Sequence, residues 1–108
     1  MPHVLEQWEK ARILNGLHDG CWKARVTAIH SCVTFKLTEM LEDIIWLVKN
    51  DHDYDVREVA VKAIGKIGSS NEIDLLEQIS KTDSDSDVRR AAKKSIQLLK
   101  EKFPQTAE

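Results

Sequence analysis

The sequence predicts an all-α protein of six antiparallel helices, paired into three hairpins. Its 108 residues include only four Gly and two Pro, the residues that most often interrupt helices. A gapless 32-residue repeat and apolar side chains at helical spacing point the same way. An apolar fraction of 42% is typical of one folded domain, here over residues 1–108, and argues against a disordered chain.

The repeat aligns three segments that begin at Asp19, Asp51 and Asp83, each 32 residues after the one before. The columns of this alignment hold identical or similar residue types. They are Ala24, Val56 and Val88; Arg25, Arg57 and Arg89; Ala28, Ala60 and Ala92; and Cys32, Ile64 and Ile96. The period continues after these columns, where it relates Leu41, Ile44 and Leu47 to Ile73, Leu76 and Ile79. The three repeats span approximately residues 3–35, 36–68 and 69–102.

Apolar side chains within each repeat recur at the spacing of an amphipathic helix. In the second repeat they fall at i, i+3, i+4, i+7, i+8 and i+11, which is one stripe of a 3.6-residue helix. The stripe consists of Val56, Val59, Ala60, Ala63, Ile64 and Ile67. Short polar breaks separate such stripes and are typical of turns. The predicted helices span residues 3–15, 20–35, 37–49, 54–67, 71–81 and 86–102.

The polar breaks carry residues suited to helix ends. Asp53 and Asp85 are placed to accept hydrogen bonds from the first-turn amides of the helices that follow. Gly68 follows the last apolar residue of its stripe and is expected to form a left-handed C-cap. Each hairpin is too small to bury its own stripe, so the three hairpins are expected to stack on one another.

The Asp, Val-Arg, Ala and large aliphatic pattern resembles a known repeat family. Asp51 and the stretch VREVAVKAIGKIG at residues 56–68 are similar to the HEAT repeat, most closely to its short HEAT-like type. The resemblance implies an α-α superhelix, or α-solenoid, with the first helices on the convex side and the second helices on the concave side. It also implies a structural ladder of carboxylates and guanidinium groups that links successive repeats. The ladder residues are Asp19, Arg25, Asp51, Arg57, Asp83 and Arg89.

The residue types that carry chemistry do not form a catalytic or metal-binding pattern. Asp51, Asp53 and Asp55 have the alternate spacing of a calcium loop, but Val56 and Lys62 stand where that loop needs Gly and a bidentate Glu. The four His lack the i, i+4 spacing of a zinc helix, and no phosphate loop or nucleophile elbow is present. We therefore expect neither enzymatic activity nor a cofactor, with a noncatalytic subunit of an enzyme assembly as an alternative.

The cysteines and the hydropathy pattern predict a cytoplasmic location. Cys21 and Cys32 lie about 16 Å apart along one predicted helix, whereas a disulfide needs Cα atoms about 6 Å apart. Free thiols are typical of a reducing compartment. No apolar run reaches the roughly 20 residues that cross a bilayer, and charged residues interrupt the start of the chain, unlike in a signal peptide.

The exposed side of the second helices is predicted to form a partner-binding ridge. Its chemistry changes along the stack, from aromatic and apolar in the first repeat to basic in the third. The ridge residues are Trp22, Val26, Ile29, Tyr54, Glu58, Val61, Lys62, Arg90, Lys93 and Lys94. Exposed aromatics often dominate interface energies, so the predicted function is a noncatalytic module or adaptor that binds another protein or peptide. In the alternative, Trp22 and Ile29 only cover the open end of a short stack.

The basic third repeat supports a second functional hypothesis, a nucleic-acid-binding protein. Arg90, Lys93, Lys94 and Gln97 share one predicted helix face, which suits phosphate contacts. The balance of 16 basic and 18 acidic side chains argues against general nucleic-acid binding. A polar cap on the terminal repeat accounts for the same residues and is the preferred interpretation.

For two further tryptophans, the neighbouring residues in the sequence predict whether the side chain is buried or exposed. Trp8 has Leu5 and Ala11 at a spacing of three and is expected to pack in the core. Trp46 lies off the main apolar stripe of its helix and is expected to be partly exposed.

Overall fold

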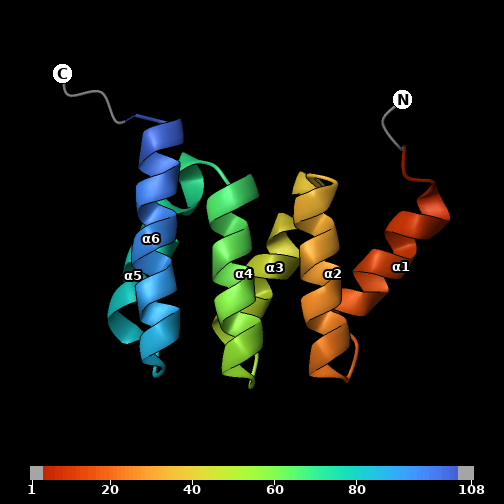
Figure 1. Cartoon of the computed structure of the whole chain (residues 1–108), viewed down its shortest axis with the longest axis horizontal. Helices are drawn as coiled ribbons and strands as arrows, with labels where there is room; N and C mark the ends of the chain where they lie inside the picture. The colour runs from red at the N-terminus through yellow and green to blue at the C-terminus, as the bar shows by residue number, and fades with distance from the viewer. Residues whose placement is uncertain (1–3, 105–108) are drawn as a thin grey trace.

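A computed structural model describes residues 4–104 and confirms the all-α fold with six α-helices in three hairpins (Figure 1). Short 3-10 turns precede two of the helices. In chain order the elements are α1 (Gln7–Leu17), α2 (Trp22–Thr34), η1 (Thr38–Met40), α3 (Leu41–Asn50), α4 (Tyr54–Ile67), η2 (Ser70–Glu72), α5 (Ile73–Thr82) and α6 (Ser86–Lys102).

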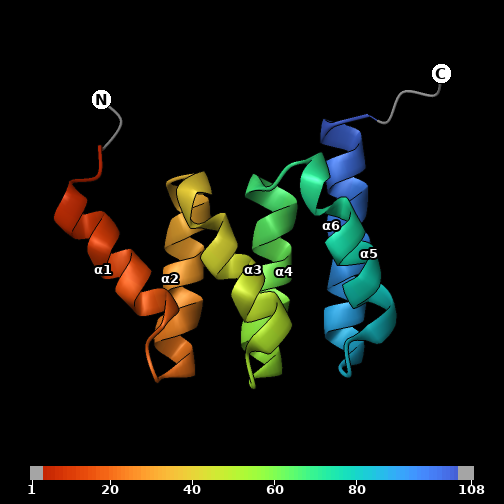
Figure 2. The ribbon, with the colours of Figure 1, turned by 180° about the vertical axis from the view of Figure 1, so that it is seen from behind.

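The helices form a two-layered stack. The parallel helices α2, α4 and α6 stand side by side in one layer, and α3 and α5 lie behind them (Figures 1 and 2). The helix α1 departs from this arrangement: it packs against α2 near its C-terminal end and splays away toward its N-terminal end. The first hairpin is therefore open on its outer side.

Helix boundaries follow the capping residues. The helices predicted at 54–67 and 86–102 coincide with α4 and α6, because Asp53 Oδ1 accepts from the Asp55 amide and Asp85 Oδ1 accepts from the Asp87 and Val88 amides. The prediction for the first helix was wrong at both ends, since α1 begins after a capping box of Glu6 and Glu9 and continues to Leu17.

Gly68 does not form the predicted left-handed C-cap. Its φ is −79°, and it is buried where a Cβ would lie 2.5 Å from the Ile64 carbonyl oxygen, so the position needs glycine for space. Lys36, one repeat earlier in the same column, has the left-handed backbone with φ of 52°. The turn from the first to the second repeat and the turn from the second to the third thus make the same connection with different backbone conformations.

The core runs through the middle of the stack. Val56, Ala60 and Ile64 are fully buried on α4, as the apolar stripe predicts. Because α4 packs against α2, α3 and α6, it buries a wider arc than a single stripe, and Val61 on its flank is buried as well. Each large aliphatic side chain buried in this way contributes roughly 2–3 kcal/mol.

Candidate functional site

The Asp and Arg columns form a ladder between successive repeats. Arg25 on α2 binds the Asp51 carboxylate through Nε and Nη2, at 2.8 and 3.0 Å. Arg57 on α4 binds Asp83 in the same way, at 3.0 and 3.2 Å. Both pairs are largely shielded from solvent, and the Nη1 groups of Arg25 and Arg57 donate to the carbonyls of Asp19 and Asp51. These groups are occupied in holding the repeats together.

The ladder ends at Asp19 and Arg89. Asp19 Oδ1 accepts from the Cys21 amide, and Arg89 Nη1 donates to the Asp83 carbonyl at 2.6 Å. Within residues 4–104, no arginine clamps the Asp19 carboxylate and no carboxylate binds Arg89. The terminal members of the ladder therefore lack the cross-repeat bond that the inner members make.

The predicted ridge is not a continuous apolar surface. Trp22 and Tyr54 are 40% and 50% exposed, but Ile29 and Val61 are completely buried, and Val26 is partly buried against the core. The prediction that Ile29 and Val61 are exposed was wrong. Their columns face the next helix of the same layer, so α4 covers the Ile29 side of α2 and α6 covers the Val61 side of α4.

Three of the five charged ridge residues form ion pairs within their own helix. Lys62 Nζ lies 3.1 Å from Glu58 Oε2, and Arg90 Nη1 lies 2.9 Å from Asp87 Oδ1. Lys93 occupies the column of Ile29 and Val61 and is exposed, because no described helix packs on that side of α6. A charged side chain suits a helix side that is in contact with solvent.

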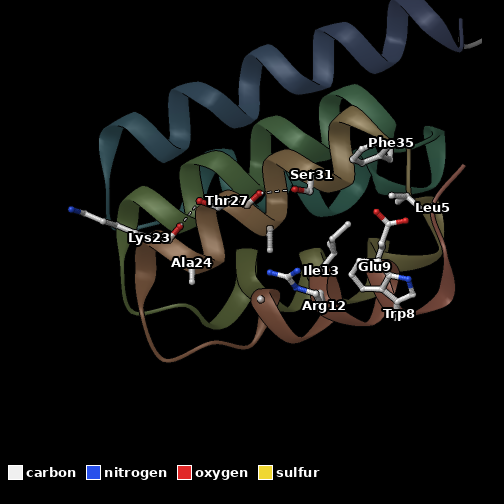
Figure 3. A pocket seen from close by; sticks show the side chains of 12 residues that line it. Leu5, Trp8, Glu9, Arg12, Ile13, Lys23, Ala24, Thr27, Ser31 and Phe35 are labelled. Carbon is white, nitrogen blue, oxygen red and sulfur yellow. Dashed lines mark hydrogen bonds between the residues drawn. The ribbon is translucent and has the colours of Figure 1, made fainter. Parts of the chain in front are cut away.

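A groove of about 500 Å³ lies between α1 and α2 (Figure 3). Gly16 allows the two helices to cross closely, since a Cβ there would lie 3.0 Å from Ala28 Cβ, and α1 splays away from this crossing. Trp8, predicted to be a core residue, is 60% exposed as a result. The lining residues are Leu5, Trp8, Glu9, Arg12, Ile13, Gly16, Lys23, Ala24, Thr27, Ala28, Ser31 and Phe35.

The groove has an apolar end and charged residues along its walls. Leu5, Trp8 and Phe35 gather at one end, whereas Lys23 lies at the other (Figure 3). Neither Arg12 nor Lys23 is paired with a carboxylate of the described residues. The Lys23 side chain extends away from the groove (Figure 3), and its Nζ lies 5.7 Å from the centroid of the Trp22 ring. The groove therefore combines apolar walls with charged groups of both signs, because Glu9 lines it as well.

The repeat explains why this face is open. On α2 the groove is lined by Ala24, Thr27, Ala28 and Ser31, which share columns with Val56, Val59, Ala60 and Ala63 of α4 and with Val88, Ala91, Ala92 and Ser95 of α6. On α4 and α6 these columns are buried or half-buried, because the preceding helix of the layer packs beside them. On this side of α2 the splayed α1 is the only described helix. The sequence signal for this face is Ala24 and Thr27, which stand in columns that hold Val56 and Val59 in the second repeat.

The His, Cys, Asp and Glu side chains are dispersed over the described part of the chain. No group of three His, Cys, Asp or Glu between residues 4 and 104 is placed to hold a metal ion. Burial raises the pKa of the Cys32 thiol to about 11, with the nearby charges of Asp43 and Glu39 adding to the shift. Cys32 Sγ contacts Met40 Sδ at 3.7 Å, so this thiol is a core group and an unreactive one. Cys21 is exposed.

A second, smaller hollow of about 240 Å³ lies beside the first ladder pair. Leu17, Trp46 and Asn50 are among its lining residues, and Trp46 is 53% exposed, as expected. His18 Nε2 lies 2.9 Å from Asp43 Oδ1 and its ring contacts Trp46. These contacts tie the end of α1 to α3.

Comparison with models of known protein families shows which family the chain belongs to. The family model of HEAT repeats matches residues 11–97 of the chain. The chain belongs to the HEAT repeat family. HEAT repeats are generally protein-interaction modules and typically have no enzymatic activity. A search of curated proteins finds no match to this HEAT repeat chain. None of its helices between residues 4 and 104 has both the length and the apolar character to cross a bilayer.

Proposed function

We propose that this HEAT repeat protein is a noncatalytic protein-interaction module and that the α1–α2 groove is its docking surface. The observation that carries the proposal is the open face of α2. Its columns are packed against a helix in both later repeats, but in the first repeat they line a groove with Trp8 and Phe35 at its rim. Such a face is built to receive another protein segment.

The groove is suited to binding energetically. Trp8 is 60% exposed, and a tryptophan that becomes buried at an interface removes about 150–250 Å² from water. Interface energy is usually concentrated in such aromatic anchors. The α2 wall is a regular helix, so little conformational entropy is lost in forming that side of the site.

The exposed part of the ridge is a second candidate surface. Trp22 and Tyr54 stand at the N-terminal ends of the neighbouring helices α2 and α4 and are both about half exposed. Lys62, Lys93 and Lys94 add exposed basic groups to the predicted ridge, although Ile29 and Val61 no longer contribute. Free Cys21 and Cys32 fit the cytoplasmic location predicted from the sequence.

Paired tryptophan variants distinguish the two surfaces. We expect Trp8→Ala to reduce partner capture from a lysate of the native cells by about tenfold or more, because a central aromatic anchor contributes at least 2 kcal/mol, whereas Trp22→Ala retains capture. Both side chains are exposed enough for the variants to keep the melting temperature of the parent. Quantitative mass spectrometry of the captured proteins is the measurement.

If Trp22→Ala lost partner capture and Trp8→Ala retained it, the docking surface would be the ridge and not the groove. If the parent protein captured no protein but was retained on DNA or RNA at low salt, and Arg90, Lys93 and Lys94 were needed for retention, the nucleic-acid hypothesis would replace the proposal.

A further inference from the structure

The side of α6 that faces away from α4 corresponds, column by column, to the side by which α4 holds α6. On α4 these columns are buried or half-buried in the stack and consist of Arg57, Val61, Ile64 and Gly68. On α6 they follow one another at i, i+4, i+7 and i+11 and form a stripe, the α6 flank, of Arg89, Lys93, Ile96 and Lys100. The described helices that pack closely on α6 are α4 and α5, and both lysines of the flank are exposed. The flank therefore has the place of a helix-holding surface without a described helix on it.

The Arg89 guanidinium is anchored as the two ladder arginines are. Arg25 and Arg57 each donate from Nη1 to a carbonyl oxygen six residues earlier and clamp a carboxylate with Nε and Nη2. Arg89 Nη1 makes the same anchoring bond, to the Asp83 carbonyl oxygen at 2.6 Å, and the residue is half-buried. No carboxylate within residues 4–104 occupies its Nε and Nη2. The guanidinium is thus held ready for a carboxylate, which lowers the entropy lost on binding.

The rest of the α6 flank adds unpaired positive charge. Lys93 and Lys100 form no ion pair with another described residue. The carboxylates of α6 itself, Asp87 and Glu101, fall outside the stripe when the helix is drawn at 3.6 residues per turn. Ile96 is the one apolar member of the flank. Three cations around one aliphatic side chain are complementary to an acidic helix, and a basic one would be repelled.

The ladder shows which group fits Arg89. Asp83, which Arg57 clamps, lies in the turn before α6, where its Oδ1 also accepts from the Asp85 amide at 2.9 Å. A carboxylate fixed in its own turn loses little freedom when an arginine binds it. The matching group for Arg89 is an Asp in the turn that precedes a partner helix.

A second contact follows from how α6 lies on α4. The two helices run parallel (Figure 1), and Ser95 Oγ on α6 donates to the Val61 carbonyl oxygen on α4 at 3.0 Å. Lys93 holds the column of Val61 on α6. A partner helix seated on α6 as α6 is seated on α4 therefore brings its residue equivalent to Ser95 next to Lys93, where a carboxylate would form an ion pair.

A protein carboxylate fits the flank better than a nucleic acid does. Asp85 and Asp87 lie in the same turn of chain as Arg89. A phosphate backbone that runs past Arg89 would meet their negative charge, whereas one Asp side chain needs to reach only the guanidinium. The two filled rungs of the ladder, at Arg25 and Arg57, also bind carboxylates.

We infer that the α6 flank binds a partner protein through an acidic helix, with an Asp of the turn before that helix clamped by Arg89 and a further carboxylate paired with Lys93. The flank and the α1–α2 groove lie at opposite ends of the stack (Figure 1) and share no residue. The inference therefore goes beyond the proposed function and does not depend on it.

The sequence of α4 supplies a probe. Residues 51–67 have Asp51 in the turn before a helix, and Ala63 stands in the column of Ser95. The probe is this peptide with Ala63→Glu, labelled with fluorescein and held helical by a lactam between Glu58 and Lys62, which already pair in α4. We expect it to bind the full chain in an anisotropy titration at low salt. Asp51→Asn in the probe should weaken binding by about tenfold or more, because an amide offers Arg89 only one oxygen.

Variants of the full chain complete the test. Arg89→Ala should weaken probe binding by about tenfold or more, and Arg89→Lys should not restore it, because an ammonium group cannot clamp both oxygens of a carboxylate. Lys93→Ala should weaken binding severalfold. Lys49→Ala is the matched control, since it removes an exposed lysine from α3, and it should bind as the parent does. Thermal melting of each variant checks that the fold is retained.

The inference is overturned if the probe does not bind, if Arg89→Ala binds it as tightly as the parent, or if Asp51→Asn leaves its affinity unchanged. A DNA oligonucleotide that displaces the probe and binds Arg89→Lys as it binds the parent would assign the flank to phosphate contacts and also overturn the inference. Loss of probe binding in Trp8→Ala would place the probe in the α1–α2 groove, with the same consequence. Partner capture that depends on Trp8 would leave the proposed function standing in each of these cases.

Discussion

At the C-terminal end of the stack, α6 presents Arg90, Lys93 and Lys94 to solvent, whereas at the N-terminal end α1 and α2 present Trp8, Phe35 and small side chains around a groove. Both surfaces are helix faces that would be covered inside a longer stack. At the C-terminal end the exposed columns hold charge, and at the N-terminal end a different set of columns holds small side chains. Residue type thus distinguishes a charged end surface from one lined by small and aromatic side chains.

The largest expected effect comes from exchanging residues within one column. Val61→Lys puts a charge where α6 covers α4 and should lower the free energy of unfolding by about 4 kcal/mol or more, because the ammonium group would be buried without a partner. Lys93→Val at the solvent end of the same column should change it by less than about 0.5 kcal/mol. Urea denaturation followed by circular dichroism measures both. If the two variants lost the same free energy of unfolding, the Val61 face of α4 and the Lys93 face of α6 would not differ in burial as described.

The ladder gives the next comparison. Arg57→Ala leaves the Asp83 carboxylate, 6% exposed, without its partner and should cost about 2–4 kcal/mol. Arg89→Ala removes an arginine that makes no cross-repeat bond within the described residues and should cost only about 1 kcal/mol. Chemical denaturation of the two variants in parallel gives the difference. A cost for Arg89→Ala as large as that for Arg57→Ala would contradict the open end of the ladder.

The smallest effect concerns the turn that follows each second helix. Lys36 has a left-handed backbone with φ of 52°, so Lys36→Gly should raise the free energy of unfolding by about 0.5–1 kcal/mol. Gly68→Ala in the next repeat should lower it, since the new Cβ would lie 2.5 Å from the Ile64 carbonyl oxygen. Thermal melts of the two variants should shift in opposite directions. If both substitutions shifted the melting temperature in the same direction, the described difference between the two turns would be contradicted.

Much of the fold could be predicted because local and repeated patterns agree. The caps at Asp53 and Asp85 fix the starts of α4 and α6, and the apolar stripe through Val56 and Ile64 fixes their inner faces. Every one of these signals lies within one helix or recurs after 32 residues.

The candidate site could be predicted less well because it depends on how helices pack across repeats. The 3.6-residue period identifies one buried stripe, but a helix inside the stack also has neighbours on its two flanks. Ile29 and Val61 were therefore assigned to an exposed ridge although α4 and α6 cover them. The groove depends on the splay of α1, and nothing in the periodicity of residues 3–15 sets the angle at which that helix crosses α2.

The splay of α1 has a consequence for local stability. Leu17 is the one fully buried residue of α1, and a half-exposed Lys10–Glu39 ion pair is among the few contacts that hold its outer part. Opening α1 about the Gly16–Ala28 crossing would leave the other five helices and both rungs of the ladder intact, so its local unfolding requires far less free energy than global unfolding. Amide hydrogens of α1 would then exchange before those of α4, and anything that bridges α1 and α2 would slow that exchange.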